Sequence, residues 1–350
     1  MGIFRKITTL VILLVIMTSP LIGDMPASSV LNMRRPIKVG VLLSNVNNSY
    51  LSSIQKALED IQRESIDKVQ FTFYDANDNQ SIQETTINNL IQGGNVDFLL
   101  VNLVNKGVDS VRNIINKARQ YEIPVIFFSS VQPDTINIIK SYKKAFVVSR
   151  DEIQSGILEG NFVVKAWNTD KSSIDKNKDD ILQYVVLQAS NNSIVGVTRT
   201  KYAISAINDS GIKTQQLALV NANFNKELAK EAIKSLFLRY GGNIEAIIAN
   251  NDSMAIGAVE ALQAYGYNKG DKSKNIIVVG IDRTQEATDL IDKGFMTGTV
   301  GHDPRILADA LYTVGMNLFS GNNPIEGTKY KSEDNGIEVR IPSEEYQVKP

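Results

Sequence analysis

The chain has 350 residues, of which 43% are hydrophobic and 21% are charged, and its formal net charge at pH 7 is −1. This is the composition of a globular protein with room for two domains, and it shows no basic excess that would indicate nucleic-acid binding. The absence of Cys excludes disulfides, thiolate metal sites and Cys nucleophiles, and a single His argues against a multi-His zinc site or a Ser-His catalytic pair.

The first 29 residues have the layout of an export signal. Arg5 and Lys6 precede an apolar run from Leu10 to Met17, and small residues follow at 27–29. The run is shorter than the roughly 20 residues of a membrane span, although an uncleaved anchor remains an alternative. No Cys follows that could carry a lipid. We therefore expect residues 1–29 to be a signal peptide or membrane anchor and the remaining chain to work outside the cytoplasmic membrane.

From residue 37 onward, short apolar runs alternate with amphipathic segments of helical length. The apolar runs form two series, at 38–43, 69–74, 97–101, 124–128 and 145–148, and at 182–187, 215–220, 244–249 and 275–280. Helices are predicted between them, for example at 52–65, 80–93 and 226–240. This alternation predicts an α/β protein with two Rossmann-like lobes, each built on a parallel sheet covered on both faces.

The series break near residues 148–150 without a flexible linker. A further strand and helix begin around 299–304, a turn follows at 321–324, and one more strand is expected at 337–342. We predict an N-terminal lobe of 36–148 plus 303–323 and a C-terminal lobe of 149–302 plus 324–350. Several crossings of the chain would then form a hinge between the lobes.

Polar side chains follow the predicted strands, where parallel sheets bind their ligands. They include Asn45, Asn47, Asn48 and Tyr50 after the first strand, and Asn102, Ser190–Ser193, Arg199, Asn250–Asp252 and Asp282 after later ones. No Gly-rich phosphate motif occurs there. Planar amide, carboxylate and guanidinium groups, with Tyr50 and Phe224 as flat surfaces, suit a neutral polyhydroxylated ligand in a cleft. The alternative for each Asn or Asp is a helix N-cap, most plainly for Asp252 and Asp282.

Residues 175–183 have the oxygen spacing of a helix-hand calcium loop. Asp175, Asn177 and Asp179 alternate, and the Ile181 carbonyl and the Gln183 side chain continue the series. Val186 stands where a bidentate Glu normally closes the loop, and Asp180 stands at the usual Gly, so that a left-handed backbone is required there. A polar loop without metal is the alternative, and a metal site needs a further carboxylate from elsewhere in the chain.

Longer stretches carry a family resemblance, at 87–105, 123–130, 141–156, 244–262 and 278–282. The chain from about residue 35 resembles the periplasmic glucose/galactose-binding proteins of bacterial ABC transporters. The resemblance implies the type I periplasmic-binding fold, with two Rossmann-like lobes, a three-segment hinge and ligand-driven closure. It also implies a structural calcium ion held by Asp175, Asn177, Asp179, Ile181, Gln183 and, as the closing carboxylate, Glu245.

The implied sugar site matches the family at some positions and departs at others. Asn102, Arg199, Asn251 and Asp282 match residues that bond sugar hydroxyls, while Tyr50 and Phe224 keep an aromatic face. Asn48, Ser193, Val195 and His302 depart from the family residues, and Val195 would leave Arg199 without a carboxylate neighbour. The expected ligand-binding set is Asn48, Tyr50, Asn102, Arg199, Phe224, Asn251, Asp282 and His302.

The leading functional prediction is a monomeric sugar-binding protein that closes around a monosaccharide and delivers it to an ABC permease, without being an enzyme. The alternative is a membrane-anchored sensor that signals to a histidine kinase or chemoreceptor. An enzyme would need paired carboxylates such as Asp151 and Glu152, but neighbours in sequence point apart, and a solvated junction between the lobes is the simpler expectation for them. A sugar-responsive repressor would need a helix-turn-helix before the first strand, where the apolar segment lies instead.

Overall fold

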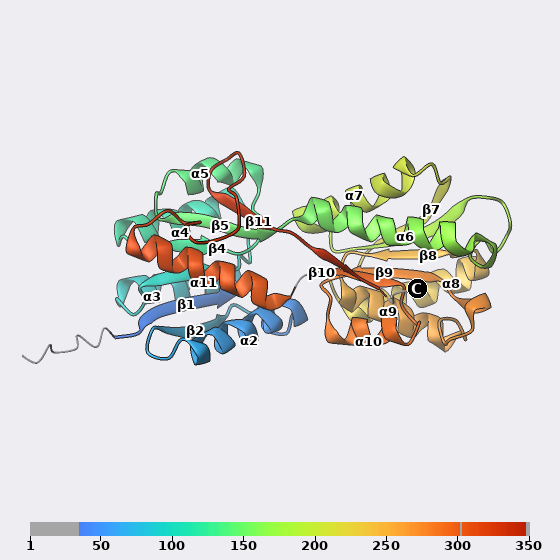
Figure 1. The fold of residues 1–350 in the computed structure, drawn as a ribbon, viewed down its shortest axis with the longest axis horizontal. Helices are drawn as coiled ribbons and strands as arrows, with labels where there is room; N and C mark the ends of the chain where they lie inside the picture. The colour runs from blue at the N-terminus through green and yellow to red at the C-terminus, as the bar shows by residue number, and fades with distance from the viewer. Residues whose placement is uncertain (1–34, 302, 348–350) are drawn as a thin grey trace, which may run out of the picture. The chain divides into compact units, whose positions relative to one another are not determined.

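The computed structural model describes residues 35–301 and 303–347, and the folded unit begins at Ile37. The predicted signal or anchor at 1–29 lies outside the described residues. Two six-stranded sheets, each covered by helices on both faces, make up this unit (Figure 1). No helix within the described residues is both long and apolar enough to cross a bilayer.

The first sheet has the strand order β11-β5-β4-β3-β1-β2, and all its pairings are parallel. Its strands are β1 (Ile37–Leu43), β2 (Val69–Asp75), β3 (Phe98–Val101), β4 (Val125–Phe127), β5 (Ala145–Arg150) and β11 (Glu338–Ile341). Its helices are α2 (Ser49–Glu64), α3 (Gln80–Gln92), α4 (Val108–Gln120), α5 (Ile136–Lys140), the short η1 (Pro133–Thr135) and α11 (Pro304–Ser320). Helices α2 and α11 share one core with the sheet, and α3 and α4 share the other.

The second sheet has the order β12-β10-β9-β8-β6-β7, with only β12 antiparallel to its neighbour. Its strands are β6 (Leu182–Gln188), β7 (Thr214–Asn221), β8 (Ala246–Ala249), β9 (Ile277–Ile281), β10 (Gly298–Gly301) and β12 (Glu344–Tyr346). Its helices are α6 (Glu152–Ile174), α7 (Ile194–Asp209), α8 (Lys226–Tyr240), α9 (Asp252–Ala264), α10 (Gln285–Asp292), and the short η2 (Gly241–Asn243) and η3 (Lys272–Lys274). Two apolar cores, one on each face, contain residues of α8 and α9 and of α6 and α7.

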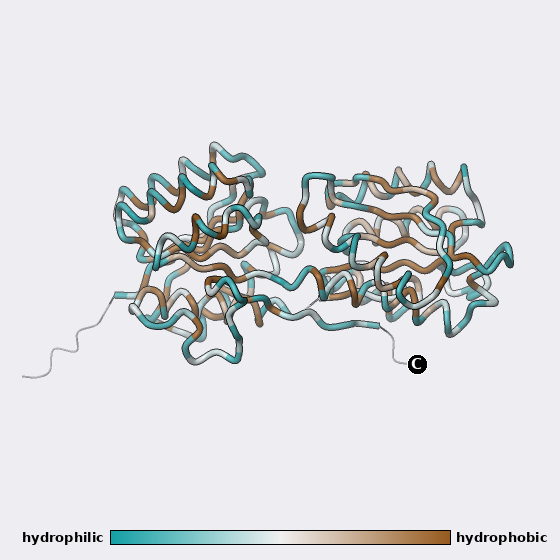
Figure 2. Tube along the Cα trace, turned by 90° about the horizontal axis from the view of Figure 1, so that it is seen from above, coloured by the Kyte–Doolittle hydropathy of each residue, from teal (hydrophilic) through white to brown (hydrophobic). Residues whose placement is uncertain are grey.

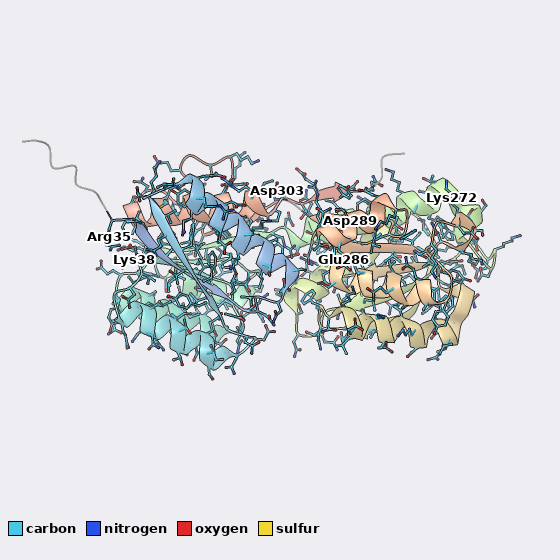
Figure 3. All side chains as sticks on the ribbon, turned by 90° about the horizontal axis from the view of Figure 1, so that it is seen from below. Arg35, Lys38, Lys272, Glu286, Asp289 and Asp303 are labelled. Atoms are coloured by element: carbon cyan, nitrogen blue, oxygen red, sulfur yellow. The ribbon has the colours of Figure 1, made fainter. Side chains whose placement is uncertain are left out.

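Burial follows the position of each strand in its sheet. The central strands β3, β6 and β8 are buried at every residue, whereas the edge strand β2 alternates between buried and exposed positions. Hydrophobic residues accordingly line the middle of each sheet in Figure 2, and charged side chains such as Lys38, Lys272, Glu286 and Asp289 lie exposed on the outside (Figure 3). This is the pattern expected of parallel sheets packed between helices, and it confirms the predicted fold class.

The chain passes between the two sheets three times, after β5, after β10 and after β11. The predicted assignment of all of 324–350 to the second lobe is wrong for β11, which pairs in parallel with β5 of the first sheet. Val339 and Ile341 of β11 are fully buried in the first core, so this strand covers an otherwise open sheet edge. The last crossing therefore lies near residues 342–343, and only β12 returns to the second sheet.

Candidate functional site

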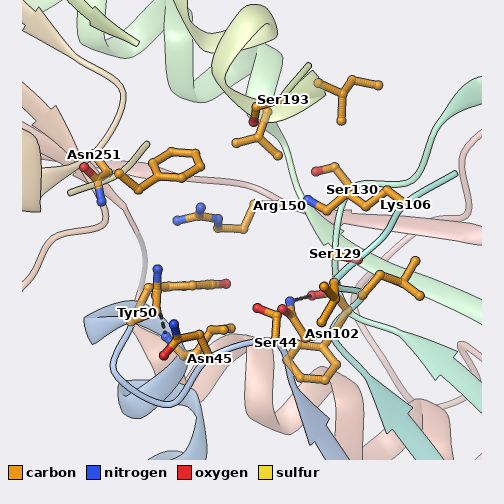
Figure 4. A pocket seen from close by; sticks show the side chains of 18 of the residues that line it. Ser44, Asn45, Tyr50, Asn102, Lys106, Ser129, Ser130, Arg150, Ser193 and Asn251 are labelled. Atoms are coloured by element: carbon orange, nitrogen blue, oxygen red, sulfur yellow. Dashed lines mark hydrogen bonds between the residues drawn. The ribbon is translucent and has the colours of Figure 1, made fainter. Parts of the chain in front are cut away.

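A cavity of about 800 Å³ is lined by residues of both lobes (Figure 4). Its size is typical of a site for a small molecule. Of the eight predicted ligand-binding residues, seven line it: Asn48, Tyr50, Asn102, Arg199, Phe224, Asn251 and Asp282. His302, the eighth, lies outside the described residues. Residues predicted from separate strand ends thus share one cavity, and whether they hold a ligand stays a prediction.

Two of the cavity amides serve both of the roles that the sequence left open. Asn48 Oδ1 accepts a hydrogen bond from Leu51 N at the start of α2 (3.1 Å), and Asn251 Oδ1 accepts one from Met254 N at the start of α9 (3.0 Å). These bonds use the carbonyl oxygens as helix N-caps. Within the described part of the chain neither amide nitrogen has a hydrogen bond, so each remains able to donate to a ligand.

Asp252 and Asp282 are not the helix caps that the sequence suggested. Asn251 caps α9, and Thr284 caps α10. Asp252 is buried and accepts hydrogen bonds from the amide and hydroxyl of Thr284 and from the hydroxyl of Thr299. Burial and the nearby Asp282 carboxylate raise the pKa of Asp252 to about 7, against the effect of these hydrogen bonds.

Four charged side chains form a compact network in the cavity. Arg150 Nη1 lies 2.7 Å from Asp282 Oδ1, and Arg199 Nε lies 2.6 Å from Glu152 Oε2. Two longer contacts complete the network, Arg150 Nε to Glu152 Oε1 at 3.7 Å and Arg199 Nη1 to Asp282 Oδ1 at 3.9 Å. All four side chains are at most 10% exposed, so solvent screens these attractions weakly.

This network corrects two predictions. Arg199 does not lack a carboxylate, because Glu152 at the start of α6 supplies the one that Val195 cannot. Glu152 is buried beside two guanidinium groups and is not part of a solvated junction. Burial acts to raise the pKa of Glu152, but Arg199 and Arg150 outweigh it, and the net pKa lies below its usual 4.5.

The guanidinium of Arg150 lies over the ring of Tyr50, 4.1 Å from its centroid. Burial raises the pKa of the Tyr50 hydroxyl to about 12, so the ring remains neutral. One face of the ring, on which stacking against a sugar was predicted, is thus covered by the Arg150 cation. Phe224, the second predicted aromatic face, lines the cavity and has a left-handed backbone, with φ of 58°.

Sequence reasoning missed Arg150, Glu152 and Lys106, which all line the cavity. Arg150 is the last residue of β5, and Lys106 comes a few residues after β3. The rule that ligands lie beyond the carboxyl ends of parallel strands had already indicated Asn102 after the run at 97–101, and following that loop to residue 106 and applying the rule to the run at 145–148 would have included both.

Glu245, the distant carboxylate predicted for the calcium loop, lies beside that loop and bonds its backbone. Glu245 Oε1 accepts a hydrogen bond from Lys176 N (2.8 Å), and its Oε2 accepts one from Gln183 N (2.9 Å). Asp180 adopts the expected left-handed backbone, with φ of 64°. Asp175 and Asp179 accept backbone hydrogen bonds within the loop, at Asp179 N, Asp180 N and Ile181 N. The side-chain oxygen of Gln183 is buried and has no hydrogen-bond partner among the described residues.

The donor set of this loop suits a hard cation. Every predicted donor atom is an oxygen, as Ca²⁺ prefers. The side-chain oxygen of Gln183, which has no hydrogen-bond partner in the described residues, could accept a contact from a cation. In the part of the chain that the structure describes, however, no three His, Asp or Glu side chains lie close enough to hold a metal. The carboxylates would have to exchange backbone hydrogen bonds for metal contacts. Calcium at this loop stays a proposal on its donor chemistry.

Comparisons with known proteins agree with this architecture. A family profile described as "Periplasmic binding protein domain" matches residues 39–323. The D-galactose/methyl-galactoside binding periplasmic protein of Haemophilus influenzae is 32% identical over 87% of this chain and 88% of its own length. The ribose import binding protein of Bacillus subtilis is 24% identical over 78% of this chain and 79% of its own. The structure of an ABC transporter solute binding protein from Bacillus halodurans with bound myo-inositol superimposes with a TM-score of 0.70 at 25% identity, covering 89% of this chain and 95% of that one.

Proposed function

This chain belongs to the periplasmic binding protein domain family, and we propose that it binds a monosaccharide between its lobes outside the cytoplasmic membrane and delivers it to an ABC permease, with no chemistry of its own. The carrying observation is the set of seven predicted residues, contributed by both lobes, that line one cavity. Named relatives bind galactose, ribose or myo-inositol. They lend no support to the alternative of a membrane-anchored sensor.

Binding would act through the hinge. A ligand that contacts side chains of both lobes has more contacts in a closed arrangement than in an open one, and this difference shifts the population toward the closed form. The permease would then recognise the closed form. Small-angle scattering with and without ligand should show a smaller radius of gyration in the bound state, and an identical radius would contradict closure.

The binding test is calorimetry on protein that has been unfolded, dialysed and refolded to remove any carried ligand. We expect a binding heat for at least one of D-galactose, D-glucose, D-ribose and myo-inositol. Asn102→Ala should weaken it about tenfold or more, because the cavity loses an amide. Asn113→Ala removes an exposed amide of the same lobe and should leave the affinity unchanged. No heat across the whole panel would refute the proposed function.

We also propose that the loop at 175–183 binds a structural Ca²⁺ with Glu245. A metal that binds only the folded form raises its stability, so excess chelator should lower the melting temperature. Asp179→Asn should abolish the chelator effect, whereas the exposed Asp209→Asn should retain it. An unchanged melting temperature with chelator would contradict the site.

We further propose that residues 1–29 direct export. N-terminal sequencing of the protein from its native host distinguishes the two fates. A start near Val30 supports a free binding protein, and an intact Met1 supports an anchored one.

A further inference from the structure

One of the cations that line the cavity, Lys106, has no direct ionic contact among the described residues. Arg150 and Arg199 are neutralised by Glu152 and Asp282 in the network described above. Lys106 lines the same cavity and directs its side chain into it (Figure 4). Among residues 35–301 and 303–347, no hydrogen bond or ion pair reaches its ammonium group. One positive charge in the cleft therefore lacks a direct partner.

The remaining acid of the lining does not compensate it. Asp78 lies on an exposed loop, and its Oδ2 accepts a hydrogen bond from Asn45 Nδ2 at 2.6 Å. Solvent screens an exposed carboxylate far more than a buried one. Burial lowers the pKa of Lys106, and Arg199 and Arg150 act in the same direction, while Glu152 opposes them. Glu152, the carboxylate that favours the charged form of Lys106, is already paired with Arg199 and Arg150.

Two further observations describe what a ligand would meet in this cavity. The side chain of Arg199 is 1% exposed, and its Nη2 has no hydrogen-bond partner in the described structure. A buried guanidinium nitrogen without an acceptor is costly, and a ligand oxygen would satisfy it. One face of the Tyr50 ring, which could otherwise stack on a neutral pyranose, is covered by Arg150.

We propose that the preferred ligand is a monosaccharide carrying one carboxylate, such as a uronate or an aldonate, and that Lys106 selects it. The inference rests on the proposed function and specifies its substrate class. One carboxylate balances the one unpartnered cation. A phosphate monoester carries about −1.5 to −2 at pH 7 and would leave excess negative charge beside Glu152 and Asp282.

Calorimetry on the refolded full chain at low salt tests the inference with D-galactose, D-galacturonate, D-gluconate and galactose 6-phosphate. At least one of the two carboxylates should bind ten times or more tighter than galactose and than the phosphate ester, and the advantage should shrink as salt is added. Galactose or the phosphate ester binding as tightly as both carboxylates would overturn the inference.

Variants separate the role of Lys106 from general damage. Lys106→Met should reduce the ratio of carboxylate to galactose affinity about tenfold, whereas Lys106→Arg should keep the preference. Lys143→Met removes one exposed positive charge from the same lobe and should leave the ratio unchanged. An unchanged ratio of carboxylate to galactose affinity in Lys106→Met would overturn the inference. The proposed function would still stand in that case, provided that a neutral sugar binds. Silence toward every neutral and acidic sugar would refute the proposed function itself.

Discussion

The most demanding prediction concerns Glu152, because one side chain connects both arginines of the cleft. In Glu152→Ala, Arg199 loses its 2.6 Å partner, and Arg150 loses its 3.7 Å contact. Removing one member of a buried ion pair costs about 3–5 kcal/mol, since the other charge stays buried. Asp282 remains 2.7 Å from Arg150 and 3.9 Å from Arg199. We therefore expect the lower end of that range, a loss of about 3 kcal/mol in the free energy of unfolding.

Urea denaturation measures this loss from the shift of the midpoint at constant slope. The matched control is Glu122→Ala. The Glu122 side chain is 82% exposed, and its carboxylate lies 3.4 Å from Lys144 Nζ. Exposed pairs contribute about 0–1 kcal/mol, so the control should lose little stability. If the two variants differ by less than about 0.5 kcal/mol, the reasoning on buried charge is refuted.

The pH dependence supplies an independent check on the same residue. The pKa of Glu152 is lowered in the folded protein, so the folded state binds its proton more weakly than the unfolded state. Its stabilising contribution is therefore complete above the usual pKa of 4.5 and is lost as the pH falls through the lowered value. The stability difference between the wild type and Glu152→Gln should shrink over that acidic window. A constant difference would contradict the assignment.

Three further changes have defined outcomes. Gly315→Ala places a Cβ 2.4 Å from the ring of Phe98 and should cost about 1–3 kcal/mol in urea denaturation, whereas Gly242→Ala meets nothing closer than 3.7 Å and should cost less. The pKa of Asp252 is raised to about 7, so its contribution to the free energy of unfolding declines as the pH rises from about 4 to about 7. Asp252→Asn should remove that decline from a plot of stability against pH, and a plot unchanged by the substitution would contradict the prediction. Asn251→Ser keeps the helix cap and should preserve the melting temperature while calorimetry shows weaker sugar binding; equal affinity would limit this residue to capping.

Local sequence determined most of the fold. Apolar runs of strand length and helices of 3.6-residue periodicity are properties of neighbouring residues, and the helix predicted at 226–240 has those bounds in α8. Because parallel strands end at a common edge, the Asn and Asp residues after them could also be placed at one site before their contacts were known. The alternating oxygens of 175–183 are equally local, and so is the need for a left-handed residue at Asp180.

Tertiary structure alone decided the pairings between distant segments. Strand β11, in which Val339 and Ile341 alternate with Glu338 and Arg340, fits the edge of either sheet by periodicity, and only its pairing with β5 assigns it to the first. Arg199 and Glu152 are 47 residues apart, and Arg150 and Asp282 are 132 apart. No periodicity relates such positions, because ion pairing depends on where folded elements converge and how far water is excluded. The sequence therefore placed many of the polar groups at the cleft, whereas the fold added Arg150 and Glu152 to them and decided which charges pair.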